Sequence, residues 1–251
     1  SEICDRAGLA AYDVSGLHGY VRGYSVAQVG TARAALQPLM LRYGFDAVER
    51  DGALRFVMRR AETAQLLDPE RLALSPDLDA TVEQTRAAEA EITGRVRVNF
   101  TEADGDFERI AEEAVLPDTA THAVAQSEVS MALTRAEGRQ VAERWLTEAQ
   151  VARDSVRLAL PPSQMTIGAG DVVDLPQGVD TVPGRYRVDR VDNGMLQQIE
   201  AVRIEPSVYM PGPLDADLAG TKGFVPSVPV QSLFLDLPLL TGEEVPHAPY
   251  L

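Results

Sequence analysis

The clearest alternation of apolar and polar residues lies between residues 134 and 176. Thr134 and Glu137 have the spacing of a capping box, in which each side chain binds a free amide at the start of a helix. The predicted helix covers residues 135–153 and has one apolar face: Val141, Ala142, Trp145, Leu146, Ala149 and Ala152. From Ser155 the period becomes two, which predicts a half-buried strand ending at Pro161-Pro162. We expect this helix and strand to organise the fold.

Residues 1–60 are predicted to form a small strand–helix–hairpin subdomain. Pro38 lies inside its second helix, where it predicts a kink or a late start of the helix. Asp51-Gly52 is typical of two-residue hairpin turns. In order, the pattern predicts a helix at 2–7, a strand at 20–26, a helix capped by Thr31 and ended by Gly44, and hairpin strands at 45–49 and 53–58.

Residues 61–94 are acidic, rich in alanine and interrupted by two prolines, so we expect a connector with one or two short strands. The spacing of Phe107, Ile110, Ala111 and Ala114 predicts a helix over residues 107–115. Two strands are expected around this segment, one at 95–100 and one with a bulge at 122–133. Further along the chain, Gly168-Ala169-Gly170 predicts a turn before an apolar strand. Strands at 185–190 and 195–204 are then expected, joined by a type I′ turn at Asn193-Gly194.

Residues 206–251 hold eight of the 16 prolines, which predicts a Pro-rich extended segment leading to a further domain. Its apolar run at 233–240 is expected to dock on a surface rather than to stay free in solvent. Both ends of the chain look like cuts in a longer polypeptide.

The net charge limits which partners the chain can bind. The formal net charge is −15, and Lys222 is the one lysine among 23 basic residues. Such a chain repels phosphate backbones and anionic membranes, so we expect no stable nucleic-acid binding and no membrane insertion by this segment. Acidity would suit a basic protein partner, and an equally good explanation is that it only aids solubility. Cys4 is the one cysteine, which excludes an internal disulfide and favours a small buried side chain.

Residue types that act in catalysis or bind metals are present, but they do not have the spacing that known catalytic or metal-binding motifs require. His18, His122 and His247 lie far apart and lack the spacing of a helical metal pair. Asp104 and Asp106 resemble a calcium loop weakly, but Arg109 stands where that loop needs glycine. Glu112 and Glu113 could be a coincidental carboxylate pair, and Asn99-Phe100-Thr101 is a glycosylation sequon within a predicted strand. Asp171 and Asp174 are interpreted as turn and edge residues of a barrel strand. We therefore expect no catalytic, cofactor-binding or metal-binding residue.

The order of these elements resembles a known family. The segments that carry the likeness are RAGL, DVSGLHGYVRGYSV, TARAALQPLMLRYGFDAVERDGALRF, RVRVNFTEADGDFE, the stretch 134–176 with GAGDVVDLP, and GRYRVDRV. This series is similar to the putative phage tail protein domain of the large tail-tip "megatron" protein of gene transfer agents, which is itself similar to baseplate hubs. The usual turn of the family is PGDVV, whereas this chain has alanine at position 169 in place of proline.

The resemblance implies a structural role. In baseplate hubs, β-barrel modules of three subunits close a ring below the tail tube and above the host-facing fibre. A TIM-barrel, glycosidase-like domain belongs to another part of the large protein, and its repeats are absent from this sequence. The family also implies an extended conformation at residues 107–115, against the helix that the spacing predicts.

We therefore expect an α+β chain, predominantly antiparallel β, with β-barrel-like tail-hub modules and a packed helix. The expected domains are residues 1–60, the connector 61–94, a barrel-like domain at 95–205 and the segment 206–251. The favoured function is a non-enzymatic homo-oligomer, a trimer in the assembled tail, that connects the tail tube to the fibre and forms part of the DNA exit path. Its expected partners are tail tube proteins and baseplate subunits, and its location is the tail tip of a virion-like particle made in the bacterial cytoplasm. The alternatives are a cell-wall or glycan-cleaving hydrolase and a glycan- or receptor-binding module.

Overall fold

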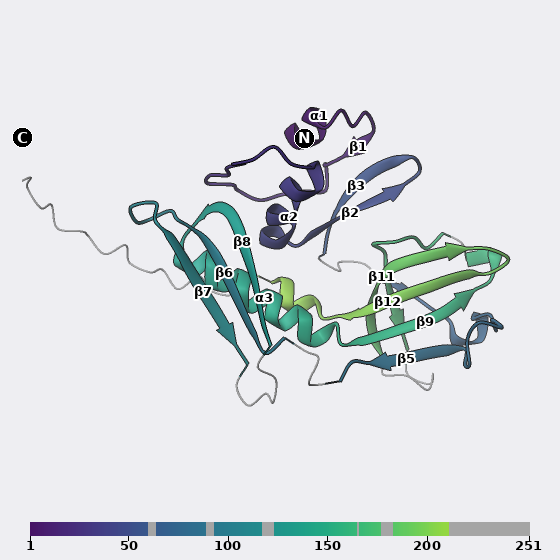
Figure 1. The fold of residues 1–251 in the computed structure, drawn as a ribbon. Coiled ribbons are helices and arrows are strands. Elements are labelled where there is room, and N and C mark those ends of the chain that lie inside the picture. The colour runs from purple at the N-terminus through teal and green to yellow at the C-terminus, as the bar shows by residue number, and fades with distance from the viewer. Residues whose placement is uncertain (60–63, 89–92, 117–122, 165, 177–182, 211–251) are drawn as a thin grey trace, which may run out of the picture. The chain divides into compact units, whose positions relative to one another are not determined.

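The computed structural model describes residues 1–59, 64–88, 93–116, 123–164, 166–176 and 183–210, all of which lie in one compact unit (Figure 1). Their strands form three open sheets, with the orders β1-β3-β2, β7-β6-β8 and β4-β10-β11-β12-β9-β5. Six of the nine strand pairings in this part of the chain are antiparallel. The expected α+β class with predominantly antiparallel strands is confirmed.

The N-terminal region, residues 1–59, combines a three-stranded sheet with two helices. Its elements are α1 (Glu2–Arg6), β1 (Tyr12–Asp13), α2 (Ala32–Tyr43), β2 (Phe45–Arg50) and β3 (Ala53–Met58). Asp51 and Gly52 have φ angles of 55° and 75°, as a type I′ turn requires, so the predicted hairpin is confirmed. The buried core of this region consists of Cys4, Phe45 and Phe56, which makes it small.

Helix α2 begins directly after Thr31, whose hydroxyl accepts a hydrogen bond from the Ala34 amide at 3.2 Å. Pro38 therefore lies within the helix. Of the two alternatives, a kink at Pro38 or a helix that starts late, the late start is wrong. Gly44 ends α2 in the left-handed conformation, with φ of 65°, as predicted. The strand predicted at residues 20–26 is also wrong, because only Tyr24 pairs with another strand, through an isolated bridge to Met131.

The second sheet carries helix α3 on one face. Its elements are β6 (Arg95–Glu102), β7 (Arg109–Val115), β8 (Val124–Leu133) and α3 (Arg135–Val151), and the helix packs on β6 and β7. The capping box is confirmed, since Thr134 Oγ1 accepts from the Glu137 amide at 3.1 Å and Glu137 Oε2 accepts from the Thr134 amide at 2.9 Å. The bulge predicted near β8 is confirmed as a register shift opposite Asn99 and Thr101 of β6.

The helix predicted at residues 107–115 is wrong, because β7 is an extended strand. Ile110 and Ala114 pair with Phe100 and Val96 of β6, and these side chains join the core beneath α3. Apolar residues four apart lie on one face of a strand as well as on one face of a helix, so their spacing alone could not decide. Pairing with β6 decides in favour of the strand.

Trp145 is not the fully buried centre of α3 that the apolar pattern suggests. Val141, Ala142 and Leu146 are buried, whereas Trp145 is half-buried and packs at the edge of the same cluster. Gly138 explains how the helix approaches the sheet, because a Cβ atom there would lie 2.1 Å from a ring carbon of Phe100. The backbone of α3 therefore rests directly on the Phe100 ring.

The six-stranded sheet has the largest core, twelve buried residues. It contains β4 (Gln65–Leu66), β5 (Val82–Arg86), β9 (Asp154–Leu160), β10 (Val172–Leu175), β11 (Gly184–Asn193) and β12 (Gln197–Ile204). The two short strands expected in the connector are confirmed, and they form the two edges of this sheet. A closed barrel does not form among the described strands, although residues 67–81 link one edge to the other.

Three short 3₁₀ segments complete the described chain: η1 (Pro69–Arg71), η3 (Pro162–Gln164) and η4 (Pro206–Tyr209). The hairpin β11–β12 is confirmed, but its type I′ turn is wrong. Asn193 pairs directly with Gln197, so residues 194–196 form a three-residue loop, and neither Asn193 nor Gly194 has a positive φ. The extended, docked segment predicted over 206–251 lies outside the described residues beyond Met210.

The contact between Gly138 and Phe100 gives a test of the packing. Gly→Ala within a helix normally stabilises by about 0.5–1 kcal/mol, but here we expect Gly138→Ala to lower the free energy of unfolding by about 1–3 kcal/mol, because the methyl group overlaps the ring. Urea unfolding measures the change. Glu143→Ala, at an exposed position of the same helix, is the control and should change stability by less than about 0.5 kcal/mol. A stabilised Gly138→Ala variant would contradict the packing of α3 on Phe100.

Candidate functional site

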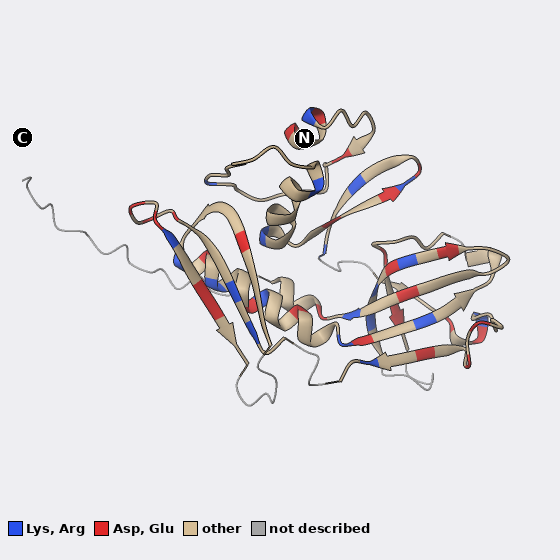
Figure 2. Ribbon diagram, viewed as in Figure 1, with Lys and Arg blue, Asp and Glu red and all other residues tan. Residues whose placement is uncertain are grey.

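The N-terminal region differs in charge from the rest of the chain. Residues 1–59 contain seven arginines and six acidic residues, a net charge of +1, within a chain of net charge −15 (Figure 2). Four of these arginines pair with acids outside the region. Arg22 and Arg42 contact Glu137, Arg50 contacts Asp171, and Arg59 contacts Glu148. The surfaces that meet here are thus complementary in charge.

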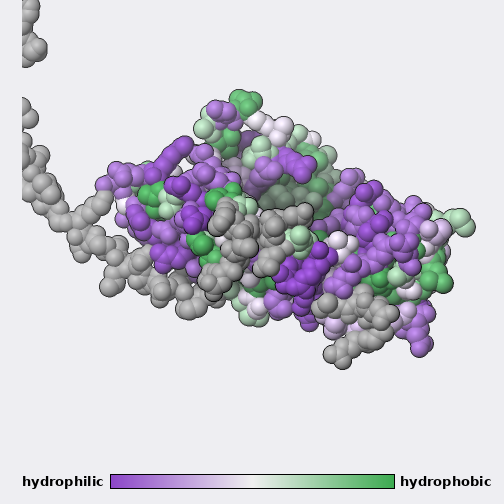
Figure 3. Space-filling view, turned by 60° about the horizontal axis from the view of Figure 1, so that its bottom comes forward, coloured by the Kyte–Doolittle hydropathy of each residue, from purple (hydrophilic) through white to green (hydrophobic). Residues whose placement is uncertain are grey.

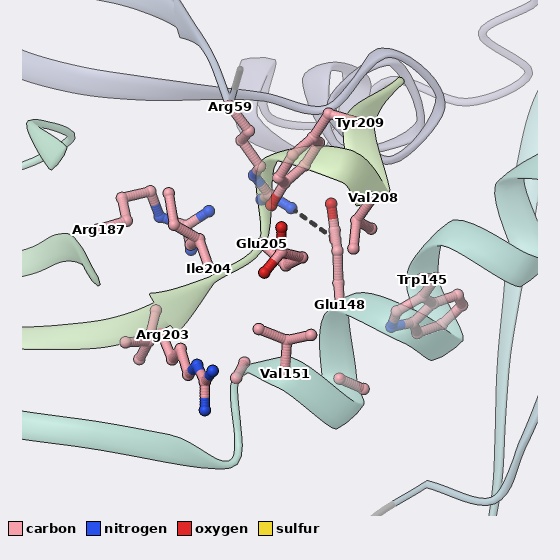
Figure 4. A pocket seen from close by; sticks show the side chains of 13 residues that line it. Arg59, Trp145, Glu148, Val151, Arg187, Arg203, Ile204, Glu205, Val208 and Tyr209 are labelled. Atoms are coloured by element: carbon pink, nitrogen blue, oxygen red, sulfur yellow. Dashed lines mark hydrogen bonds and ion pairs between the residues drawn. The ribbon is translucent and has the colours of Figure 1, made fainter. Parts of the chain in front are cut away.

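Arg59 is the centre of the most elaborate of these contacts. It follows β3 directly, and its guanidinium donates from Nε and Nη2 to the two carboxylate oxygens of Asp46, at 3.0 and 2.8 Å. Its Nη1 donates to Glu148 Oε2 of α3 at 3.1 Å (Figure 4). The three side chains are 16–24% exposed. A planar guanidinium that binds one carboxylate with two parallel hydrogen bonds fixes geometry as well as charge.

Two further arginines surround the same carboxylates. Arg187 of β11 lies 3.6 Å from Asp46, and Arg144 of α3 lies 3.9 Å from Glu148. Arg144 also donates to the carbonyl oxygens of Leu41 and Arg42, at the end of α2. We call the set Asp46, Arg59, Arg144, Glu148, Arg187 and Tyr209 the arginine junction. It joins α2, β2, α3, β11 and η4 through charged and polar contacts, beside the apolar packing of α2 on the core under α3.

The pKa values show how closely these charges are coupled. Burial by itself would lower the pKa of Arg59, but its hydrogen bonds to Asp46 and the charges of Asp46 and Glu148 raise it above the usual range. Burial lowers the pKa of Arg144. Burial, followed by the negative charge of Glu148, raises the pKa of Tyr209 to about 12, so its phenol stays protonated at neutral pH. The junction is therefore fully charged on its arginine side, with a neutral tyrosine beside it.

A cavity of about 210 Å³ lies beside the junction. It is lined by the C-terminal part of α3, the end of β12 and η4, with Trp145 at one side and Arg59 and Tyr209 at another (Figure 4). Arg187 pairs with Asp46 and Asp189, and Arg203 pairs with Asp154 at 3.2 Å. Since these cations already have partners within the chain, the cavity is a gap between charged elements rather than a preformed anion site.

A second contact joins the N-terminal hairpin to the six-stranded sheet. Arg50 donates from Nη1 to both carboxylate oxygens of Asp171, at 2.9 and 3.1 Å, and from Nη2 to the Thr166 carbonyl oxygen at 2.8 Å. Gly170 has φ of 84°, and a Cβ there would lie 2.9 Å from a methyl carbon of Val48. The predicted turn before β10 is confirmed, and its glycine allows the hairpin to approach.

A third contact lies at the start of α3. Glu137 accepts from the Thr134 amide and pairs with Arg42 at 3.2 Å and with Arg22 at 3.4 Å. Burial would raise the pKa of Glu137, but the amide of Thr134 and the two arginines lower it overall. A general acid of a glycosidase needs the opposite shift. Glu137 is thus a charged cap that binds two arginines.

The residues considered from the sequence are scattered. His18 is exposed, whereas His122 and His247 lie outside the described residues. Glu112 and Glu113 are neighbours on β7 and point to opposite faces, so Glu112 lies 3.6 Å from Arg139 and Glu113 lies 3.9 Å from Arg95. Asp171 is a turn residue, as interpreted, and Cys4 is buried. Within the described ranges, no group of three or more His, Cys, Asp or Glu could hold a metal ion.

The arginine junction was not predicted. Arg59 and Glu148 are 89 residues apart, and Arg50 and Asp171 are 121 apart, so no local motif joins them. A signal did exist in the uneven distribution of acids along the chain, since the N-terminal region alone is not acidic. No helix of the described residues is long and apolar enough to cross a membrane.

Comparison with known proteins identifies relatives of this architecture. A family model described as putative phage tail protein matches residues 31–191, more than half of the chain. No curated protein matches the chain. A solved chain from the virion of a native gene transfer agent particle is 54% identical, with a TM-score of 0.78 over 84% of this chain and 47% of that chain. The present chain thus spans about half the length of that relative.

Two further solved structures are more distantly similar, and the first of them shares the fold. The tail protein from Neisseria meningitidis MC58 is 10% identical, with a TM-score of 0.53 over 80% of this chain and 64% of that chain. The 43 kDa tail protein of prophage MuSo2 from Shewanella oneidensis is 11% identical, with a TM-score of 0.48 over 74% of this chain and 58% of that chain.

Removal of Arg59, the central cation of the arginine junction, should destabilise the fold. We expect Arg59→Gln to lower the free energy of unfolding by about 2–3 kcal/mol, because the largely buried Asp46 and Glu148 lose their hydrogen bonds to Arg59 and keep only the longer contacts with Arg187 and Arg144. Arg55→Gln is the matched control, since it breaks the exposed pair with Asp51 and should cost less than about 0.5 kcal/mol. Urea unfolding measures both. A double-mutant cycle with Glu148→Gln should give a coupling energy above about 0.5 kcal/mol, and strict additivity would contradict the contact.

The ion pairs of Glu137 should make the stability of the fold depend on pH. Its folded pKa lies below the unfolded value, so the stabilisation is present above about pH 4.3 and is lost as the pH falls through the folded pKa. Glu137→Gln should therefore be less stable than the wild type by about 1 kcal/mol at pH 7, and this difference should shrink at about pH 3. Urea unfolding at the two pH values measures it. A difference that stays constant or grows at low pH would show that the carboxylate does not bind the arginines.

Proposed function

The chain belongs to the putative phage tail protein family, and from this premise we propose that it is a structural part of the tail of a gene transfer agent particle. The observation that carries the proposal is the 54% identity to a chain of a gene transfer agent virion over 84% of the present sequence. Identity at this level over most of a chain goes with the same fold and the same kind of assembly. The matched chain is about twice as long as the present one.

Within the tail, we propose that the chain acts as a baseplate-like hub at the tip, connecting the tail tube to the host-facing fibre. In this role it would contact tail tube proteins and neighbouring baseplate subunits, in three copies around the DNA exit path. The net charge of −15 supports a place beside passing DNA, since acidic walls repel phosphate and keep the DNA from binding. The six-stranded sheet, whose edges β4 and β5 are linked by residues 67–81, would supply the barrel-like module of this hub.

We further propose that the role is non-enzymatic and that residues 1–60 and 95–205 act as two hub domains. The support is chemical: the carboxylates gathered between elements, namely Asp46, Glu137, Glu148 and Asp171, are each bound to at least one arginine. A glycosidase of the usual kind needs one carboxyl group that holds a proton and a second that stays free to attack or to activate water. The connector 61–94 supplies β4 and β5 to the larger domain.

Imaging of assembled particles tests this proposal. A particle whose tail gene carries a small tag after residue 210 should show the tag at the tail tip, with three copies around a central channel, in averaged electron micrographs. A matched particle with the tag on a capsid protein controls for accessibility. Finding the tag on the capsid, or along the tail shaft, would overturn the hub. A copy number other than three would overturn the trimeric ring and leave the tail location in place.

A further inference from the structure

The segment from residue 14 to residue 45 contains no aspartate or glutamate, although the chain holds 38 acidic residues in 251. It carries Arg22, Arg33 and Arg42, and four of its large apolar side chains are exposed: Tyr20 at 75%, Val21 at 43%, Val26 at 61% and Val29 completely. The surface view shows hydrophobic side chains gathered over the N-terminal part of the molecule (Figure 3). We call this part of the molecule the acid-free surface. It is apolar and free of acids on an otherwise acidic chain; Arg22 and Arg42 pair with Glu137, and Arg33 is exposed on α2.

A cavity of about 470 Å³ opens on the acid-free surface. Most of its lining is apolar, including Val14, Leu17, Val21, Leu36 and Phe56, and Glu2 is the one acidic residue that lines it. Pockets in which a partner inserts an aromatic side chain have an apolar interior of this kind. Nothing among the described residues fills this cavity.

The hairpin between β6 and β7 has the opposite character. Phe107 at its tip is 69% exposed and has φ of 56°, a conformation that a bulky residue rarely adopts. Asp104, Asp106 and Glu108 flank it, and all three are exposed. The aromatic ring is exposed to water, and the backbone that carries it has an unfavourable conformation. Both features are typical of a residue that contacts a binding partner.

We propose that the acid-free surface binds the β6–β7 hairpin of a second copy of this chain, with Phe107 as the anchor in the cavity. The acids beside Phe107 would then face Arg33 and a surface without acids on the first copy, and the ring would leave water. The charges and the apolar groups are complementary on the same chain, and Phe107 of one copy is exposed, so it does not fill its own cavity. This contact gives a physical form to the homo-oligomer proposed above and rests on that proposal only for the presence of several copies.

A charge swap tests the contact. The surface variant carries Arg33→Glu, which is exposed in the first turn of α2, where an acid does not destabilise a helix. The hairpin variant carries Asp104→Arg and Glu108→Arg. In sedimentation velocity at low salt, the wild type should self-associate with increasing concentration, and about 1 M NaCl should weaken this association. Each variant alone should associate at least tenfold more weakly.

The decisive sample is an equimolar mixture of the two variants. In it, acidic surfaces meet basic hairpins, so association should return toward the wild-type level in a symmetric pair. A ring of three keeps one mismatched contact, so there association should return in part and still exceed that of either variant alone. Association of either single variant at wild-type strength would overturn the proposal. A mixture that stays as weak as its components would also overturn it, as would a wild type that remains monomeric at every soluble concentration. The last result would assign the cavity to a different partner. Because this test uses the purified chain, it fails or succeeds independently of the particle imaging.

Substitution of the anchor separates binding from folding. Phe107→Asn should preserve or raise stability in thermal unfolding, because asparagine tolerates the left-handed conformation, while self-association falls at least tenfold. Val115→Ser is the control at the other end of β7, where the side chain is 52% exposed, and it should associate like the wild type. Unchanged association of Phe107→Asn would show that the ring is not the anchor.

Discussion

The attachment of the cationic N-terminal region to an acidic chain is the interaction on which the rest of the structure depends. This region buries only Cys4, Phe45 and Phe56 in its own core, whereas the core of the six-stranded sheet contains twelve buried residues and the core under α3 contains ten. Three buried side chains do not offset the conformational entropy of about 60 ordered residues. The region is therefore held by contacts with the rest of the chain. Its apolar side chains pack on the core under α3, and arginine pairs to Glu137, Glu148 and Asp171 fix the position of α2 and the β2–β3 hairpin.

The strength of this attachment comes from geometry rather than from the number of charges. Exposed ion pairs contribute little, but Arg50 and Arg59 each bind one carboxylate through two hydrogen bonds and a further oxygen through a third. The side chains of the arginine junction are mostly buried, so removal of Arg59 leaves Asp46 and Glu148 with only their longer contacts to Arg187 and Arg144. The same arrangement explains the lack of catalytic character at the junction, because a carboxylate bound to arginine is a poor base and a poor acid.

Local patterns in the sequence predicted the elements that local interactions decide. The capping box at Thr134, the Asp51-Gly52 turn and the Gly44 end of α2 depend on neighbours within four residues, and all three are confirmed. The conformation of residues 107–115 and the loop after Asn193 depend on strand partners, and there the local signal failed. The arginine junction and the places of β4 and β5 depend on contacts across tens of residues, which a single sequence does not record. The family resemblance implied the extended conformation of β7, which the spacing of apolar residues did not predict.

A chain held together in this way suits a connector in a particle, since it presents several open sheet edges and a surface of uneven charge to its neighbours. Hydrogen exchange at increasing salt tests the electrostatic attachment most directly. Between about 0.05 and 1 M NaCl, the amides of α2, β2 and β3 should lose protection, while those of β6, β9 and β12 should keep it, because screening weakens only the charged contacts. Equal protection of all these strands at both salt concentrations would contradict the view that ion pairs hold the N-terminal region to the rest of the chain.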